Sequence, residues 1–301
     1  MLSGISTNNF TKFSIGALAI LSVNLAFAGT SLKKSDLEKV PLNELHPTQK
    51  NVGYFQAEKK QLPELEGIVS RCNIMKEYSG QDGYSTSDCY QHELKDYLKE
   101  NYIPVVEYHH EYFLVDHHHL AYALDLLFNK VDGDPEVYIK VVQTYPDSYS
   151  PTTVWDKMIE NNQLWPYYYS KDENKYEKIS DNSDNGNPFN SLPMNVTDLG
   201  NDPYRSIFGL ARSLDPIKFE KPSLEQTNFY QFKWAACLLS ASDSKYDADV
   251  KDLASKSMPK AIYGAKIVLK DIASDGGKIM QQCQSANPKE FNNIPRPELK
   301  D

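Results

Sequence analysis

Residues 103–128 constrain the fold of this chain more than any other stretch. Two runs of apolar, β-branched and aromatic residues, 103–108 and 112–116, are separated by three polar residues, which predicts a β-hairpin. Apolar residues then recur at helical spacing as far as Phe128, which predicts a helix. The chain must therefore turn from a strand into a helix through residues 116–119.

The flanking elements predict an α+β protein in two parts, an N-terminal α/β domain at 29–145 and a mainly helical region at 146–301 packed on it. The first part holds a short strand at 41–45 and then a helix with Thr48 as its N-cap. Further elements are predicted as a polar helix near 91–99, a strand at 137–142, a helix opening at Pro151, and helices at 203–212, 224–240 and 250–274.

The N-terminus predicts a cleavable signal peptide at residues 1–28. Only Lys12 is charged there, the apolar run 13–25 is too short to span a bilayer comfortably, and Ala26-Phe27-Ala28 has the small-x-small pattern of a cleavage site. The other interpretation of this segment is an uncleaved membrane anchor. With cleavage after Ala28, we expect an exported protein, periplasmic or secreted, with no membrane span.

The charge balance disfavours nucleic acid as a partner without excluding it. Cleavage would remove one lysine and no acid, changing the net charge from −9 to −10. Proteins that hold nucleic acid by its phosphates usually have a basic face and a high pI, whereas this chain has a pI near 5.3. A local basic patch is still compatible with these numbers.

Four cysteines in an exported chain predict disulfides. Three pairings are open, and we favour Cys72–Cys89 with Cys237–Cys283 because each bridge closes a local loop. A mobile loop is predicted between Cys72 and Cys89. No Cys-x-x-Cys spacing is present, which argues against a zinc ribbon or a redox motif.

Five of the seven histidines lie between His109 and His119, but they do not read as one metal site. An extended strand rises roughly 3.3 Å per residue, so His110 and His117 would lie about 23 Å apart. His109 and His110 are predicted as an exposed hairpin tip. The metal, if any, is left undetermined.

The predicted corner at residues 116–119 is the candidate functional site. Backbone N–H groups at the start of a helix favour anions, and a carboxylate with imidazoles can act as acid and base near neutral pH. We therefore single out Asp116, His118 and His119 as catalytic and His117 as ligand-binding. The alternative is that Asp116 caps the helix and one histidine packs locally.

Residues around the first predicted helix are further ligand-binding candidates. Thr48, Gln49 and Lys59 flank it, and the alternative is a simple N-cap with a solvated face. The three tryptophans and the tyrosines at 167–169 could form a stacking platform, although aromatic residues at such spacing are more often core.

These residues together resemble the ParB-like nuclease domains of the ParB/sulfiredoxin superfamily, in an exported bacterial branch of unknown activity. The resemblance covers most of the predicted mature chain. It rests on Leu45-His46-Pro47-Thr48-Gln49, Val52-Gly53, Lys59, Ile103-Pro104-Val105-Val106, Tyr112 to Ala121, Trp155, Asp202-Pro203-Tyr204-Arg205-Ser206 and Phe232-Lys233-Trp234-Ala235.

The resemblance implies an α/β domain in which the corner binds the phosphates of a nucleotide. Asp116 matches the family's acid, and His118 and His119 match its polar corner. Two positions depart from the pattern: His117 stands where a glycine is usual, and Leu120 stands where a phosphate-binding arginine is expected.

Arg205 is the candidate to supply the missing guanidinium from the C-terminal half. The alternative is that Arg205 pairs with a nearby carboxylate such as Asp202.

Two functions follow. The first is an enzyme acting on a phosphate-containing substrate, a nucleotide or nucleic acid, as a nuclease, nucleotide hydrolase or phosphotransferase, with a divalent metal or a nucleotide as a conceivable cofactor. The second is a non-catalytic binding module that has lost the phosphate-binding arginine. Nothing in the residues identifies a protein partner, and fold alone does not decide between the two.

Overall fold

A five-stranded sheet forms around the predicted hairpin. β4 (Ile103–Tyr108) and β5 (Glu111–Leu114) pair antiparallel. Between them, His109 and His110 have φ angles of 51° and 62°, as a two-residue type I′ turn requires. Both residues are solvent-exposed, so the predicted hairpin tip is confirmed.

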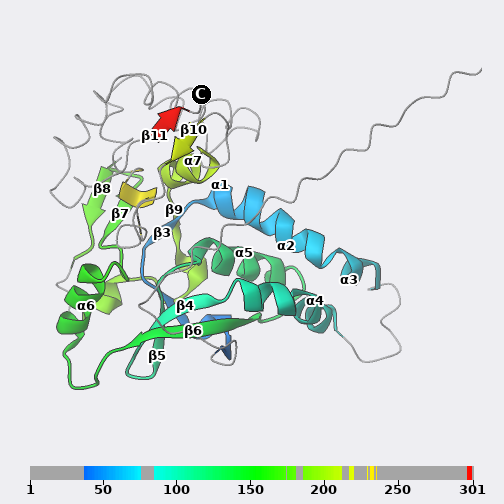
Figure 1. The fold of residues 1–301 in the computed structure, drawn as a ribbon, viewed down its shortest axis with the longest axis horizontal. Coiled ribbons are helices and arrows are strands. Elements are labelled where there is room, and N and C mark those ends of the chain that lie inside the picture. Colours follow the sequence, from blue (N-terminus) through cyan, green and yellow to red (C-terminus); the bar gives the residue numbers. More distant parts are fainter. Residues whose placement is uncertain are drawn as a thin grey trace, which may run out of the picture. The chain divides into compact units, whose positions relative to one another are not determined.

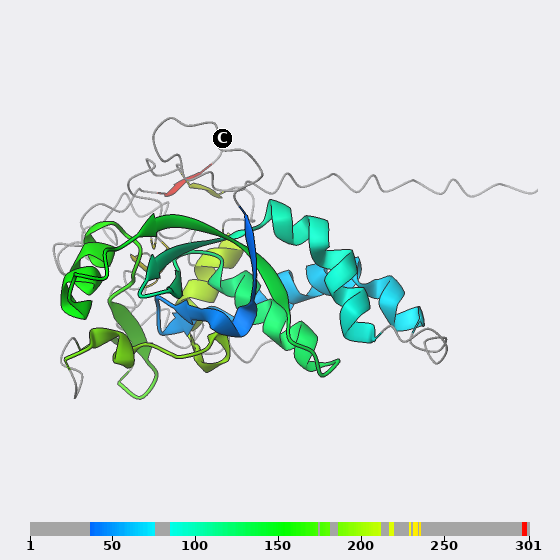
Figure 2. The same cartoon turned by 90° about the horizontal axis from the view of Figure 1, so that it is seen from below.

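The remaining strands extend this pair on both sides. β6 (Glu136–Thr144) runs parallel to β4, and β1 (Glu38–Pro41) pairs antiparallel with β6. β2 (Leu45–Pro47) runs parallel to β5 at the opposite edge, so the order is β1-β6-β4-β5-β2. Figure 2 shows the curvature of this sheet, most visible in the long strand β6.

This computed structural model describes residues 37–75, 85–173, 175–180, 186–211, 217–219, 229, 231–233, 235 and 297–299. The predicted signal peptide, the predicted mobile loop at 78–85 except Ser85, the pair Cys237–Cys283, the predicted helix at 250–274 and most of that at 224–240 lie outside these residues. The proposed boundary at residue 145 stays a prediction.

Helices cover one face of the sheet (Figure 1). α5 (His118–Asn129) follows the hairpin at the predicted corner and connects β5 to β6, which lies on the other side of β4 in the sheet. α4 (Thr86–Glu100) contacts β6, and its N-cap Ser85 accepts a hydrogen bond from the backbone N–H of Asp88 at 3.0 Å. The polar helix predicted near 91–99 is therefore confirmed and longer than expected.

The first helical segment begins later than predicted. One strand was expected at 41–45, but a 3₁₀ turn, Leu42–Glu44, separates β1 from β2. The helix capped by Thr48 was also wrong. After β3 (Asn51–Val52), three helical pieces follow one another: α1 (Tyr54–Gln56), a π-helical turn (Ala57–Gln61) and α2 (Leu62–Ile68).

Thr48 does not cap the helix because its polar groups are used elsewhere. Its hydroxyl donates to the carbonyl oxygen of Leu114 at 2.6 Å, and its carbonyl accepts the N–H of Trp165 at 3.0 Å. The residue is fully buried between β5 and the segment that precedes β7. Tertiary contacts have therefore replaced the local cap.

The sheet is buried on both faces by two hydrophobic clusters. Val105 and Leu114 join α2, α4 and α5 in the first cluster. Their neighbours in the strands, Val106 and Phe113, belong to the second cluster with Trp155 of α6. Successive residues of a strand face opposite sides of the sheet. This alternation explains why β4 reads as a nearly continuous apolar run, as strands covered on both faces do.

The described residues beyond 145 contain strands as well as helices. α6 (Pro151–Glu160) begins as predicted at Pro151, and α7 (Pro203–Ala211) matches the helix predicted there. The additional elements are β7 (Tyr167–Ser170), β8 (Lys175–Lys178), the 3₁₀ turns Pro188–Ser191 and Val196–Asp198, β9 (Gly200–Asn201), β10 (Ile217–Phe219) and β11 (Pro297–Leu299). The protein is α+β, as expected, with these strands as an addition to the helices.

The favoured disulfide between Cys72 and Cys89 is present. It joins α3 (Ser70–Met75) to α4 across 17 residues of sequence. Among the described residues no helix is both long enough and apolar enough to cross a membrane.

We predict that replacing Cys72 and Cys89 together with alanine lowers the free energy of unfolding by roughly 2–4 kcal/mol, because the unfolded chain loses a loop constraint. Urea denaturation of the double variant and the wild type measures this difference. Adding a reductant to the double variant then tests separately whether the predicted bridge between Cys237 and Cys283 contributes to stability. An unchanged urea midpoint would contradict the prediction.

Candidate functional site

The corner between β5 and α5 has the backbone of a glycine turn without the glycine. His117, the residue before α5, has φ 66° and ψ 22°, in the left-handed region that side chains rarely adopt. Its N–H donates to Oδ1 of Asp116 at 2.7 Å, and its Nδ1 lies 3.3 Å from the carbonyl oxygen of Asn101. The position where the resemblance expected glycine therefore keeps the glycine conformation.

Asp116 does not cap α5, because its described bond goes to the residue that precedes the helix and no side chain caps the N-terminus of α5. Asp116 is half-buried at the end of the hairpin. Its carboxylate therefore stays at the corner rather than on the helix.

His118 and His119 are buried and point to the segment that joins β2 to α1. Nε2 of His118 accepts the backbone N–H of Thr48 at 3.3 Å, and Nε2 of His119 accepts the backbone N–H of Gly53 at 3.3 Å. The two side chains are 2% and 8% exposed. Two adjacent histidines thus hold both ends of residues 48–53 against the start of α5.

These contacts decide the protonation of both rings. A backbone N–H is always a donor, so each Nε2 must be an unprotonated acceptor and each neutral ring carries its proton on Nδ1. Burial, reinforced by the positive charge of Arg205, lowers the pKa of His118 and of His119 well below the ordinary value. Lys60 further lowers the pKa of His119.

Arg205 reaches the corner from α7. Its Nε donates to Nε2 of His119 at 3.4 Å, and its guanidinium stacks on the ring of Phe232, 3.8 Å from the centroid. The side chain is 7% exposed. Arg205 therefore lies at the corner, although 86 residues separate it from His119. This placement is consistent with the expectation that Arg205 supplies a guanidinium from the C-terminal half.

Asp202 caps the start of α7, and the charge of Arg205 also acts on its carboxylate. Oδ1 of Asp202 accepts the backbone N–H of Arg205 at 2.9 Å, as an N-cap does, and Oδ2 accepts the hydroxyl of Tyr176 at 2.5 Å. Burial raises the pKa of Asp202 and raises that of Tyr176 well above its usual range. The carboxylate is fully buried, so these bonds compensate for lost water.

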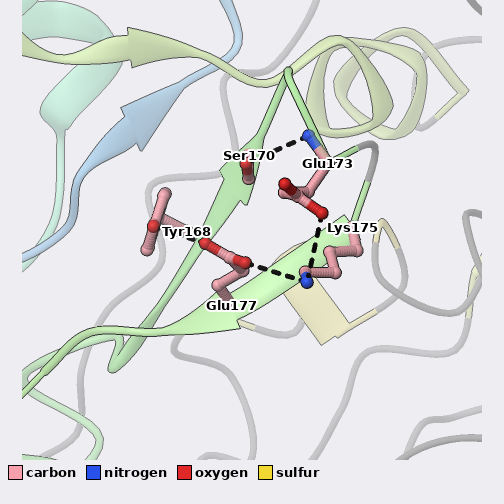
Figure 3. A network of polar contacts seen from close by, with 5 residues as sticks. All are labelled: Tyr168, Ser170, Glu173, Lys175 and Glu177. Carbon is pink, nitrogen blue, oxygen red and sulfur yellow. Dashed lines mark hydrogen bonds and ion pairs between the residues drawn. The ribbon is translucent and has the colours of Figure 1, made fainter.

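Tyr176 belongs to the β7–β8 hairpin, whose exposed side carries its own polar network (Figure 3). Lys175 bridges Glu173 and Glu177 at 3.5 and 3.1 Å, and Glu177 accepts the hydroxyl of Tyr168 at 2.6 Å. Of these contacts, the bond between Tyr168 and Glu177 joins the two strands at residues that face each other in the register.

At Gly53, α7 packs closely against the β3–α1 segment. A Cβ at this position would lie 2.8 Å from Oγ and 3.0 Å from the backbone nitrogen of Ser206. The N–H of Asp202 also donates to the carbonyl oxygen of Val52 at 2.9 Å. Figure 1 shows α1 and α7 next to each other. The absence of a side chain at residue 53 therefore permits the contact between Arg205 and His119.

The other predicted ligand-binding residues differ in their burial and contacts. Gln49 is fully buried, and its Nε2 donates to the carbonyl oxygen of Asn51 at 2.8 Å. Lys59 is exposed on the π-helical turn, whereas the charge of its neighbour Lys60 acts on His119. Thr48 is joined to His118 through its backbone and not through a capping hydroxyl.

Two of the three tryptophans are core residues, which is the interpretation that the sequence favoured over a stacking platform. Trp155 and Trp165 are 2% and 4% exposed, and Trp165 stacks on Phe232 with centroids 5.2 Å apart. Trp234 lies outside the described residues. Within the described ranges, no group of three or more His, Cys, Asp or Glu side chains is placed to hold a metal ion.

The fold and this corner define a class of α+β proteins with a strand–helix site, and the comparisons name a family. The family described as "Putative ParB-like nuclease" matches residues 38–240, more than half of the chain. The chain therefore belongs to this family.

The chain is also similar to solved structures. The crystal structure of protein Atu1540 from Agrobacterium tumefaciens matches with 22% identity and a TM-score of 0.49, over 80% of this chain and 94% of that chain. A comparison with curated proteins found no match.

Sequence reasoning missed three members of the cluster: Gly53 and Ser206 as contact partners and Tyr176 as the partner of Asp202. Gly53 and Ser206 stand inside the stretches that carry the family resemblance, which was the available signal. Tyr176 had none, because a lone tyrosine in a polar hairpin has no distinctive spacing.

We predict that Gly53→Ala destabilises the protein by about 1–3 kcal/mol, because its Cβ would collide with the backbone of Ser206. Gly67→Ala is the matched control. Nothing lies within 4 Å of a Cβ at this exposed helical position, so we expect a gain of roughly 0.5–1 kcal/mol. Urea denaturation of both variants measures the contrast, and equal effects would refute the packing argument.

We predict that stability falls as pH drops below about 6.5, the ordinary histidine pKa. The unfolded histidines then take up protons that the folded ones, with lowered pKa values, do not. Each histidine costs on the order of 1 kcal/mol per pH unit until its folded pKa is reached. The raised pKa of Asp202 acts in the opposite direction at lower pH.

Urea denaturation between pH 8 and pH 5 measures this slope. The variant His118→Gln, His119→Gln retains acceptors but does not titrate, so its slope should be shallower. The control is His92→Gln, at an exposed position of α4. Identical slopes in all three proteins would show that the buried pair is not responsible.

Proposed function

We propose that this protein binds and processes a phosphate-containing substrate, a nucleotide or nucleic acid, at the β5–α5 corner. The observation that carries the proposal is the Arg205 guanidinium, held by His119 at 3.4 Å where Leu120 replaces the arginine expected from the family resemblance. A guanidinium is the side chain best suited to grip phosphate oxygens. Membership of a family described as nuclease-like supports the same direction.

The corner supplies the other parts of such a site. The N–H groups in the first turn of α5 favour an anion, and the left-handed His117 lets the backbone turn sharply there. Asp116 is the group we assign to proton transfer. His118 and His119 would act through Nδ1–H as donors, since Nε2 of each ring is already occupied.

We also propose that the protein is exported. The predicted leader at residues 1–28 supports this proposal, and the Cys72–Cys89 disulfide is compatible with it. A divalent metal or the nucleotide itself is the cofactor class that we propose. No group of three or more metal-ligating side chains is present among the described residues, so phosphate oxygens would supply ligands to the metal ion.

A specific observation favours the second function, a non-catalytic binding module. Leu120 is 5% exposed and belongs to the first core cluster, so it has become a packing residue. The lowered pKa values of His118 and His119 likewise favour neutral, structural imidazoles over proton carriers. Binding without turnover would identify this function.

We predict that Arg205→Lys weakens nucleotide binding by about tenfold or more, because lysine keeps the charge but loses the two-pronged donor. Thermal unfolding of the purified protein against a panel of nucleotides, with and without Mg²⁺ or Mn²⁺, measures binding. A ligand at a hundred times its Kd stabilises by roughly 2.7 kcal/mol, a readily detected shift. Product analysis on nucleotides and single-stranded DNA then separates binding from turnover.

Arg71→Lys is the matched control for this experiment. Arg71 is exposed and pairs with Glu93 on the surface, so the change should leave nucleotide binding unaltered. Equal binding by wild type and Arg205→Lys would exclude the corner as the phosphate site. The absence of any nucleotide or metal shift in the wild type would refute the proposed function.

A further inference from the structure

Ser206 holds a buried hydroxyl that nothing in the described chain satisfies. The residue is 5% exposed in the first turn of α7, and its Oγ has no hydrogen-bond partner among the described residues. Serine in a helix commonly bonds back to the carbonyl four residues earlier. Here the carbonyl oxygen of Asp202 accepts the backbone N–H of Ser206 at 3.2 Å, and no bond from the hydroxyl is present.

This hydroxyl lies within the His119 cluster. Gly53 is its neighbour, since a Cβ on Gly53 would be 2.8 Å from Oγ of Ser206. The N–H of the same glycine donates to His119, which also accepts from Arg205, the residue before Ser206. The unsatisfied hydroxyl of Ser206 and the guanidinium of Arg205 therefore both lie beside the contact between Gly53 and His119.

A buried hydroxyl without a partner destabilises the folded state, because water no longer satisfies it. Most buried polar atoms are paired, so an exception needs an explanation such as a missing ligand. Gln49 adds a second case beside the same segment, since its buried Oε1 is also without a partner among the described residues. The Nε2 bond of Gln49 to Asn51 fixes that orientation.

We propose that Ser206 is a substrate-binding residue, whose hydroxyl donates a hydrogen bond to an oxygen of the phosphate held by Arg205. This inference rests on the proposed function. The ligand class is a terminal phosphate of a small molecule. Arg205, Ser206 and His119 are each less than a tenth exposed, which suits a group that enters end-on. An internal phosphodiester carries chain on both sides and needs an open groove, and the net charge of −9 repels a polyanion.

The experiment compares wild type with Ser206→Ala by isothermal titration and thermal unfolding. The probes are a nucleoside 5′-monophosphate and the dinucleoside monophosphate of the same base, whose only phosphate is internal. We expect the wild type to prefer the 5′-monophosphate by about tenfold or more, and Ser206→Ala to lose about tenfold in affinity for it. Without ligand, the unfolding midpoint of Ser206→Ala should equal or exceed that of the wild type, because the change removes an unsatisfied group.

Ser191→Ala is the control, since this half-buried serine donates to the carbonyl oxygen of Ser180 away from the corner. Three outcomes overturn the inference while leaving the proposed function standing. They are equal 5′-monophosphate affinity in wild type and Ser206→Ala, a lower ligand-free midpoint in Ser206→Ala that marks a structural hydroxyl, and equal affinity for the two probes. If neither probe, nor any nucleotide in the panel, binds the wild type, the proposed function fails and this inference fails with it.

Discussion

Much of the site depends on one nitrogen atom. Nε2 of His119 accepts N–H groups from Gly53 and Arg205, and so joins three segments that are distant in sequence: the β3–α1 junction, the start of α5 and the start of α7. The neighbouring His118 accepts the N–H of Thr48, which lies before β3, and so adds a second link between the start of α5 and residues 48–53. Without an unprotonated imidazole here, the backbone donors of residues 48–53 would face a buried cation, which a low-dielectric interior disfavours.

This arrangement couples the protonation of the corner to its geometry. Burial and the charge of Arg205 lower the pKa of both histidines well below the ordinary value. Both rings are therefore neutral near neutral pH. The positive charge comes instead from Arg205, which does not titrate there. Asp202 and Tyr176 hold α7 in place from the other side. At the corner, the positive charge thus comes from Arg205, and the two neutral histidines are the acceptors.

Leu120 stands where the family resemblance implies an arginine, and it packs in the core as part of α5. A guanidinium lies at the same corner, but it comes from Arg205, which is 86 residues further along the chain than His119. Close approach is possible because Gly53 has no side chain. The family match over more than half of the chain establishes the family. The ligand must still be decided by the chemistry of these particular residues.

The sequence by itself determined the elements whose signals are local. The apolar, β-branched and aromatic runs at 103–108 and 112–116, the helical spacing from Leu120 and the cysteine spacing predicted the hairpin, α5 and one disulfide, because neighbouring residues carry that information. It misplaced the cap at Thr48, whose hydroxyl bonds Leu114 across the fold. Only the tertiary structure decided that His119, Gly53 and Arg205 meet, which nitrogen of each buried histidine is free of a proton, and that Ser206 faces the same point. Contacts between distant segments leave no periodicity in the chain, and burial, which sets the pKa values, is a property of the packed whole.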